Sequence, residues 1–135
     1  MAILWRKELE IDGATIDEDH KFLINLINNY ELALHIKSKQ KLVELSLKTL
    51  KHYTIQHFKR EEELQRLSFY PFAQAHIHEH QDLIKTLDNI TKMASEKAPE
   101  KISELLKDWL INHIIQSDLR MKPYIKPNQW FQCIQ

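Results

Sequence analysis

Apolar residues recur at intervals of three and four along four long segments of this chain, and no segment alternates regularly between apolar and polar residues. Spacing of this kind places side chains on one face of an α-helix, whereas a half-buried strand would alternate. The pattern predicts helices over about residues 17–37, 41–67, 72–95 and 99–119. An arm, residues 1–16, precedes the first helix, and a short tail, residues 120–135, follows the last.

Local signals at the segment ends agree with this division. The stretch from Thr15 to Glu18 has the form of a capping box, which satisfies free backbone N–H groups at a helix start. Pro99 suits the first turn of the fourth helix. Because the connections are short, consecutive helices are expected to run antiparallel. The sequence therefore predicts an all-α fold, an antiparallel up-down-up-down four-helix bundle, as a single domain over residues 1–135, with Trp5 and Trp130 as candidate anchors of the arm and tail.

Charge and composition exclude several classes of function. The chain has 19 Lys and Arg against 19 Asp and Glu, so it lacks the basic field that recruits nucleic acid or an anionic membrane. Its apolar runs are too short for a membrane span or a signal peptide, so we expect a cytoplasmic protein. A single cysteine, Cys133, rules out an internal disulfide, and we expect its thiol to be incidental.

The histidines are concentrated in clusters that include carboxylates. Four clusters stand out: His20 alone, His57 with Glu61, His76 with His80, and His113 with Asp118. Helical residues four apart share a face, so the second and third clusters can each direct two donors at one point. The remaining histidines and the neighbouring glutamates fall off these faces, and we assign them to solvent: His35, His52, His78, Glu62 and Glu63.

The clusters fall at helix ends that meet in an antiparallel bundle, namely the starts of the first and third helices and the ends of the second and fourth. Burying these groups unpaired would cost several kcal/mol, which metal coordination offsets. Seven donors exceed the four ligands of a structural zinc, and one cysteine cannot hold an iron–sulfur cluster. If both carboxylates and an oxo or hydroxo group bridge two metals, the set falls one position short of two complete octahedra.

The spacing of the last cluster is irregular. His113 and Asp118 are five residues apart, which separates them by about 140° on a regular helix. We expect Asp118 to reach the site from the edge of the helix or through a locally widened turn.

In their order and spacing, these residues resemble the hemerythrins, specifically the single-domain bacterial ones. The matching segments are Trp5, IDEDH at 16–20, HFKREE at 57–62, YPFAQAHIHEH at 70–80 and WLINHIIQSD at 109–118. The resemblance implies a non-haem di-iron centre with His76, His80 and His113 on one iron and His20 and His57 on the other. Glu61, Asp118 and an oxo or hydroxo group would bridge the irons. O2 would bind at the second iron, in a pocket lined by Leu23, Phe58, Trp109, Leu110 and Ile114.

The leading hypothesis is an oxygen carrier, store or buffer rather than an enzyme, with O2 as its ligand and an acceptor protein left open. We expect the chain to be a monomer. One alternative is a sensor of O2, nitric oxide or redox state that uses the same site, although the chain has no room for an output domain. Another is a di-iron peroxidase or oxidase, but no organic substrate pocket is evident in the sequence. A purely structural bundle is the fourth reading, and it predicts that the seven ligands tolerate conservative substitution.

Overall fold

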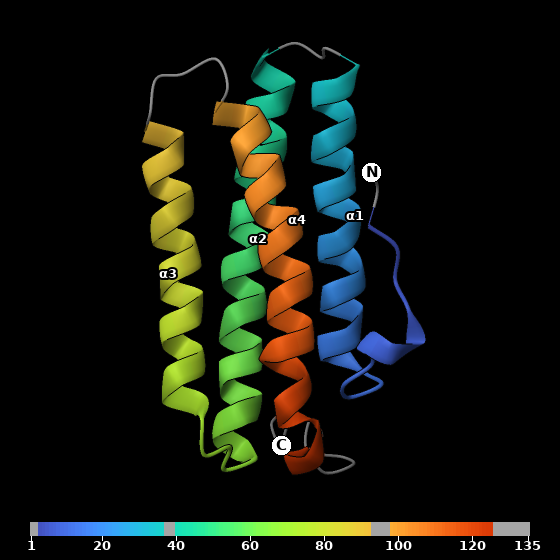
Figure 1. Ribbon diagram of the computed structural model, residues 1–135, viewed down its shortest axis with the longest axis vertical. Coiled ribbons are helices and arrows are strands. Elements are labelled where there is room, and N and C mark those ends of the chain that lie inside the picture. The colour runs from blue at the N-terminus through green and yellow to red at the C-terminus, as the bar shows by residue number, and fades with distance from the viewer. Residues whose placement is uncertain (1–2, 37–39, 93–97, 126–135) are drawn as a thin grey trace.

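In the computed structural model, the described part of the chain forms four long helices that run side by side and alternate in direction (Figure 1). The structure describes residues 3–36, 40–92 and 98–125. Its long helices are α1 (Thr15–His35), α2 (Gln40–Leu67), α3 (Ala73–Lys92) and α4 (Ala98–Gln116), and its short 3-10 helices are η1 (Lys7–Leu9) and η2 (Asp118–Tyr124). The predicted all-α, up-down-up-down bundle is confirmed.

The four helices close into a ring. α1 contacts α2 and α4, and α3 contacts the same two helices. Within the described residues, no helix is both long and apolar enough to span a lipid bilayer.

The start of α1 differs from the predicted capping box. No side chain at the N-cap position, Ala14, caps the helix. Instead, the backbone N–H groups of Ile16 and Asp17 donate to the Asp12 carboxylate, at 2.9 and 3.1 Å. Asp17 in turn accepts hydrogen bonds from the N–H groups of Ile11 and Gly13. The capping group therefore comes from the arm, which is tied to the start of the helix by the same bonds.

The fourth helix ends earlier than the predicted residue 119. α4 stops at Gln116, Ser117 leaves the helix, and the chain tightens into η2 from Asp118. This change redirects the backbone at the point where the irregular five-residue spacing occurs. The proposed helix-edge position or widened turn for Asp118 is therefore wrong, because Asp118 begins a separate 3-10 helix.

The core consists of two apolar clusters with a polar layer between them. The larger includes Leu23, Leu50, Leu87 and Ile114, and the smaller includes Leu64 and Met121. His20 lies on α1 between Ile16 of the smaller cluster and Leu23 of the larger one. This arrangement surrounds the polar layer with apolar side chains along the bundle axis.

The arm packs along α1 (Figure 1). Leu9 is fully buried and Trp5 packs against the larger cluster, so Trp5 anchors the arm as expected. Asn28 joins the same contact, since its side chain both donates to and accepts from the backbone of Ile3. Trp130 and Cys133 lie outside the described residues, as do the final residues predicted for the third helix.

Candidate metal centre

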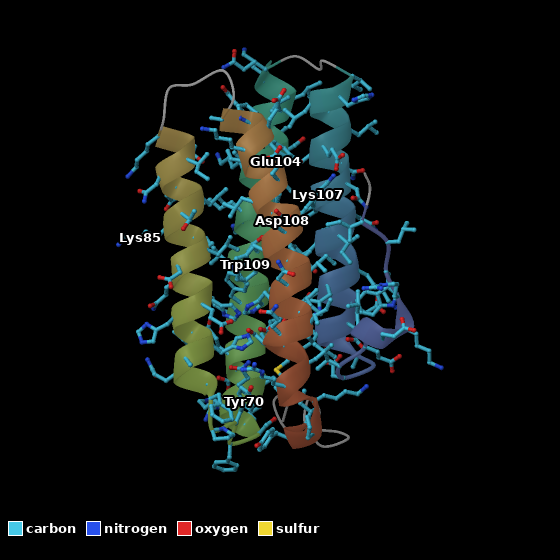
Figure 2. The ribbon with its side chains drawn as sticks, viewed as in Figure 1. Tyr70, Lys85, Glu104, Lys107, Asp108 and Trp109 are labelled. Carbon is cyan, nitrogen blue, oxygen red and sulfur yellow. The ribbon has the colours of Figure 1, made fainter. Side chains whose placement is uncertain are left out.

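The seven candidate ligands come together in one buried layer of the bundle. Figure 2 shows nitrogen-bearing side chains between the helices, at levels between the labelled Trp109 and Tyr70. All seven are buried: His20, His57, Glu61, His76, His80, His113 and Asp118. His35, His52 and His78 are exposed, as predicted.

The ligand atoms form two groups that share both carboxylates. One group contains three histidines (His76, His80 and His113), and the other contains two (His20 and His57); Glu61 and Asp118 belong to both. Within each group, the ligand atoms all lie within 4.8 Å of one another. The names three-histidine group and two-histidine group are used for them below.

Glu61 divides its two oxygens between the groups. Its Oε1 lies 2.7 Å from Nε2 of His76 and 3.1 Å from Nε2 of His80. Its Oε2 lies 3.2 Å from Nε2 of His57 and 3.4 Å from Nε2 of His20. This carboxylate thus stands between the two groups with one oxygen toward each.

Asp118 also directs one oxygen toward each group. Its Oδ1 lies 2.8 Å from Nε2 of both His76 and His113. Its Oδ2 lies 3.1 Å from Nε2 of His20. The start of η2 is what places this carboxylate opposite Glu61, so both carboxylates have the disposition that a bridging ligand requires.

Three further acids contact the outer nitrogens of the histidine rings. Nδ1 of His57 donates to Asp19 at 2.9 Å, and Nδ1 of His80 donates to Glu62 at 2.8 Å. Nδ1 of His113 lies 2.9 Å from a Glu79 oxygen. Each acid is on the helix before that of its histidine, which ties α1 to α2, α2 to α3, and α3 to α4.

Asp19 is itself held by other side chains. Arg60 donates from two nitrogens to the two Asp19 oxygens, at 2.8 and 2.9 Å, and the Tyr53 hydroxyl donates at 2.8 Å. Burial raises the pKa of Asp19, but His57, Arg60 and Tyr53 outweigh burial and lower the pKa to about 2. Asp19 is therefore ionised and fixed in orientation.

The two shared carboxylates alter the titration of the histidines. Burial lowers the pKa of His20 and of His76, but Asp118 and Glu61 outweigh burial and raise both to about 10. Burial and Glu61 raise the pKa of Asp118, yet His113 and His20 outweigh them and hold it well below its usual range. The layer therefore combines anionic carboxylates with histidine rings that hold a proton more tightly than a free imidazole does.

The donor set fits a pair of metal ions. The 2.8 Å contact of Nδ1 of His80 with Glu62 favours the tautomer that presents the Nε2 lone pair to a metal. That Nε2 lies 3.1 Å from Nε2 of His113, which is 3.0 Å from Nε2 of His76. Nitrogen atoms so close need a cation or a proton between them. In the same layer, buried atoms of His20, Glu61 and Asp118 have no hydrogen-bond partner among the described residues. A metal would satisfy them.

Comparison with known proteins places this layer in context. The family model for the hemerythrin HHE cation binding domain matches residues 13–125, which include all seven candidate ligands. The chain belongs to the hemerythrin family.

Individual relatives cover most of both chains. A bacteriohemerythrin from Stenotrophomonas maltophilia is 30% identical over 93% of this chain and 84% of its own length. A myohemerythrin from Theromyzon tessulatum is 29% identical over 87% of this chain and 89% of its own. A hemerythrin from Phascolopsis gouldii is 31% identical over 88% of this chain and 90% of its own. The resemblance to the hemerythrin family inferred from the sequence is confirmed.

Two aromatic rings lie flat against candidate ligands. Phe58 stacks on His80 with ring centroids 3.7 Å apart, and Trp109 stacks on His113 at 4.2 Å. The two aromatic rings are 5.6 Å from each other. The other predicted pocket residues, Leu23, Leu110 and Ile114, are buried in the larger apolar cluster. Their contact with bound O2 stays a prediction.

Sequence reasoning missed the acids that contact the outer ring nitrogens. The assignment of Glu62 to a solvated charge run is wrong, because its carboxylate accepts from His80. Glu63 is exposed and pairs with Arg66, as that assignment implied. The sequence did contain a signal, because each of these acids is the direct neighbour of a candidate ligand. Asp19 precedes His20, Glu62 follows Glu61 and Glu79 precedes His80.

Proposed function

We propose that this protein binds O2 reversibly at a non-haem di-iron centre and serves as an oxygen carrier, store or buffer. The observation that carries the proposal is the division of the Glu61 and Asp118 oxygens between two groups of histidines. A single metal would not need both carboxylates turned in this way. Two adjacent metals would use every inward-facing atom of the layer.

The proposed ligand set follows the two groups. His76, His80 and His113 would hold one iron, His20 and His57 would hold the other, and Glu61 and Asp118 would be shared, with an oxo or hydroxo group between the irons. A pair of ferrous ions held there would supply the two electrons for O2 binding and would recover them on release. The two-histidine group has one ring fewer, so it is the side on which O2 has room to bind.

The surrounding side chains keep the ligands in place and water out. The Asp19, Glu62 and Glu79 contacts fix the rotation of three histidine rings, so that Nε2 of each faces inward. Phe58 and Trp109 each cover one face of a candidate ligand, His80 and His113 respectively. We propose that these rings, with Leu23, Leu110 and Ile114, form the apolar surroundings of bound O2. Excluding water protects the bound state from irreversible oxidation.

Cycles of oxygenation test this function. The purified protein is loaded with ferrous iron under argon, exposed to air and then returned to vacuum, while visible absorption is recorded. We expect absorption to appear with O2, to bleach under vacuum and to return over several cycles. His113→Ala should lose the response, whereas His78→Ala, on an exposed position of α3, should keep it. Absorption that does not bleach would contradict reversible binding and favour a di-iron oxidase or peroxidase.

A further inference from the structure

The carboxylates behind the histidine rings are distributed unequally between the two groups. The three-histidine group has two of them, Glu62 on His80 and Glu79 on His113. Neither glutamate forms an ion pair with a lysine or arginine among the described residues. Each therefore adds a negative charge directly behind a ring that faces the metal layer.

The two-histidine group has less negative charge behind its rings. Among the described residues, the one carboxylate behind its rings is Asp19, which Arg60 binds through two hydrogen bonds, so the Asp19–Arg60 pair is close to neutral. Its other ring, His20, has a buried Nδ1 without a hydrogen-bond partner among the described residues. The charge behind this group is therefore near zero, compared with two negative charges behind the other.

A carboxylate on the outer nitrogen of a ligating histidine makes the inner nitrogen a stronger electron donor. Hydrogen bonding of this kind is one of the means by which a protein sets the reduction potential of iron. We propose that Glu62 and Glu79 make the three-histidine position the easier of the two to oxidise, while Arg60 cancels the corresponding effect of Asp19 at the two-histidine position. This inference rests on the proposed di-iron centre.

Exposure to solvent does not remove the effect of Glu62 and Glu79 on the two histidine rings. The side chains of Glu62 and Glu79 are 29% and 44% exposed, which weakens their action through space. Their contacts, however, are to buried rings, and the effect passes through the ring itself. Glu62 and Glu79 are thus positioning residues that act through His80 and His113.

Potentiometric titration of the iron-loaded protein tests the inference. Diferrous protein is oxidised anaerobically with ferricyanide, which takes one electron from one iron at each step and becomes ferrocyanide. Iron content is measured first for every variant. Failure of the native chain to hold two irons would refute the di-iron centre itself. Two irons with unchanged potentials in the variants would refute only the unequal charge.

Variants behind the two groups are expected to shift the reduction potentials in opposite directions. Glu62→Gln and Glu79→Gln, made separately, are expected to raise the potential of the first oxidation step more than that of the second. Arg60→Met leaves Asp19 uncompensated and is expected to lower the second potential more than the first. Arg60→Lys restores the charge and should recover the native value.

Glu63→Gln is the matched control, because Glu63 adjoins Glu62 but pairs with the exposed Arg66. Its two potentials should equal those of the native protein. A merely structural role would not give shifts of opposite sign at two separate steps. The inference is overturned if both glutamine variants match the Glu63→Gln protein, or if every variant moves both steps equally.

Discussion

Phe58 lies flat against His80, with ring centroids 3.7 Å apart and planes 5° from parallel. Phe58 is itself 5% exposed, so the ring covers one face of the histidine inside the bundle. A candidate ligand from α3 is thereby shielded by a ring from α2. The contact therefore couples the packing of α2 against α3 to the shielding of a candidate ligand.

Phe58→Leu should shorten the lifetime of bound O2. Leucine keeps most of the buried volume, so we expect a loss of about 1 kcal/mol in the free energy of unfolding and no loss of iron. Without the flat ring, water reaches the centre more readily, and the oxygenated protein should oxidise irreversibly several times faster. The decay of its visible absorption measures this rate. Phe22→Leu, at a residue 46% exposed, is the control and should decay at the native rate.

Asp118→Asn should remove one iron. The amide is close in shape to the carboxylate but carries no charge and offers one oxygen instead of two. Since each Asp118 oxygen faces a different group, we expect iron content to fall from two to about one per chain, measured by elemental analysis of folded protein. Asp108→Asn, at an exposed residue of α4, should retain two. Full iron content in Asp118→Asn would show that this residue does not bridge.

The sequence was sufficient to predict the bundle and the convergence of the seven candidate ligands, because both follow from helix periodicity and alternating direction. It was not sufficient for contacts between helices. Glu62 reaches His80 only because of how α2 and α3 are rotated about their axes, which periodicity within one helix does not determine. The local backbone structure at Asp118 was mispredicted for a related reason. Its position depends on the break at Ser117, and no proline or glycine marks that break.

Iron binding should release protons. Asp118 and Glu61 outweigh burial and raise the pKa of His20 and of His76 to about 10. At neutral pH both rings are therefore cationic, with a proton on each nitrogen, and a metal must displace one proton from each ring. Lowering the pH strengthens the competing proton, and the apparent affinity for Fe2+ should therefore fall from about pH 8 to about pH 6. An indicator dye in weakly buffered solution reports the release. Binding without any change in dye colour would contradict these pKa directions.

The start of α1 offers a test of stability that does not involve the metal. Asp12→Ala removes the acceptor for the N–H groups of Ile16 and Asp17 and should cost about 1 kcal/mol in the free energy of unfolding. Thr15→Ala should cost less than about 0.5 kcal/mol, because Thr15 does not act as the helix cap. Urea denaturation followed by circular dichroism compares the two variants. A larger loss of unfolding free energy in Thr15→Ala than in Asp12→Ala would instead support the capping box predicted from the sequence.

The measurement that bears most directly on the whole account is the Mössbauer spectrum of protein loaded with 57Fe and fully oxidised, recorded at low temperature in an applied field. Two irons held by shared carboxylates and an oxo or hydroxo bridge should couple antiferromagnetically. We expect two irons per chain and a spectrum without intrinsic magnetic splitting. A single iron per chain, or two irons that behave as independent high-spin ferric ions, would contradict the di-iron centre.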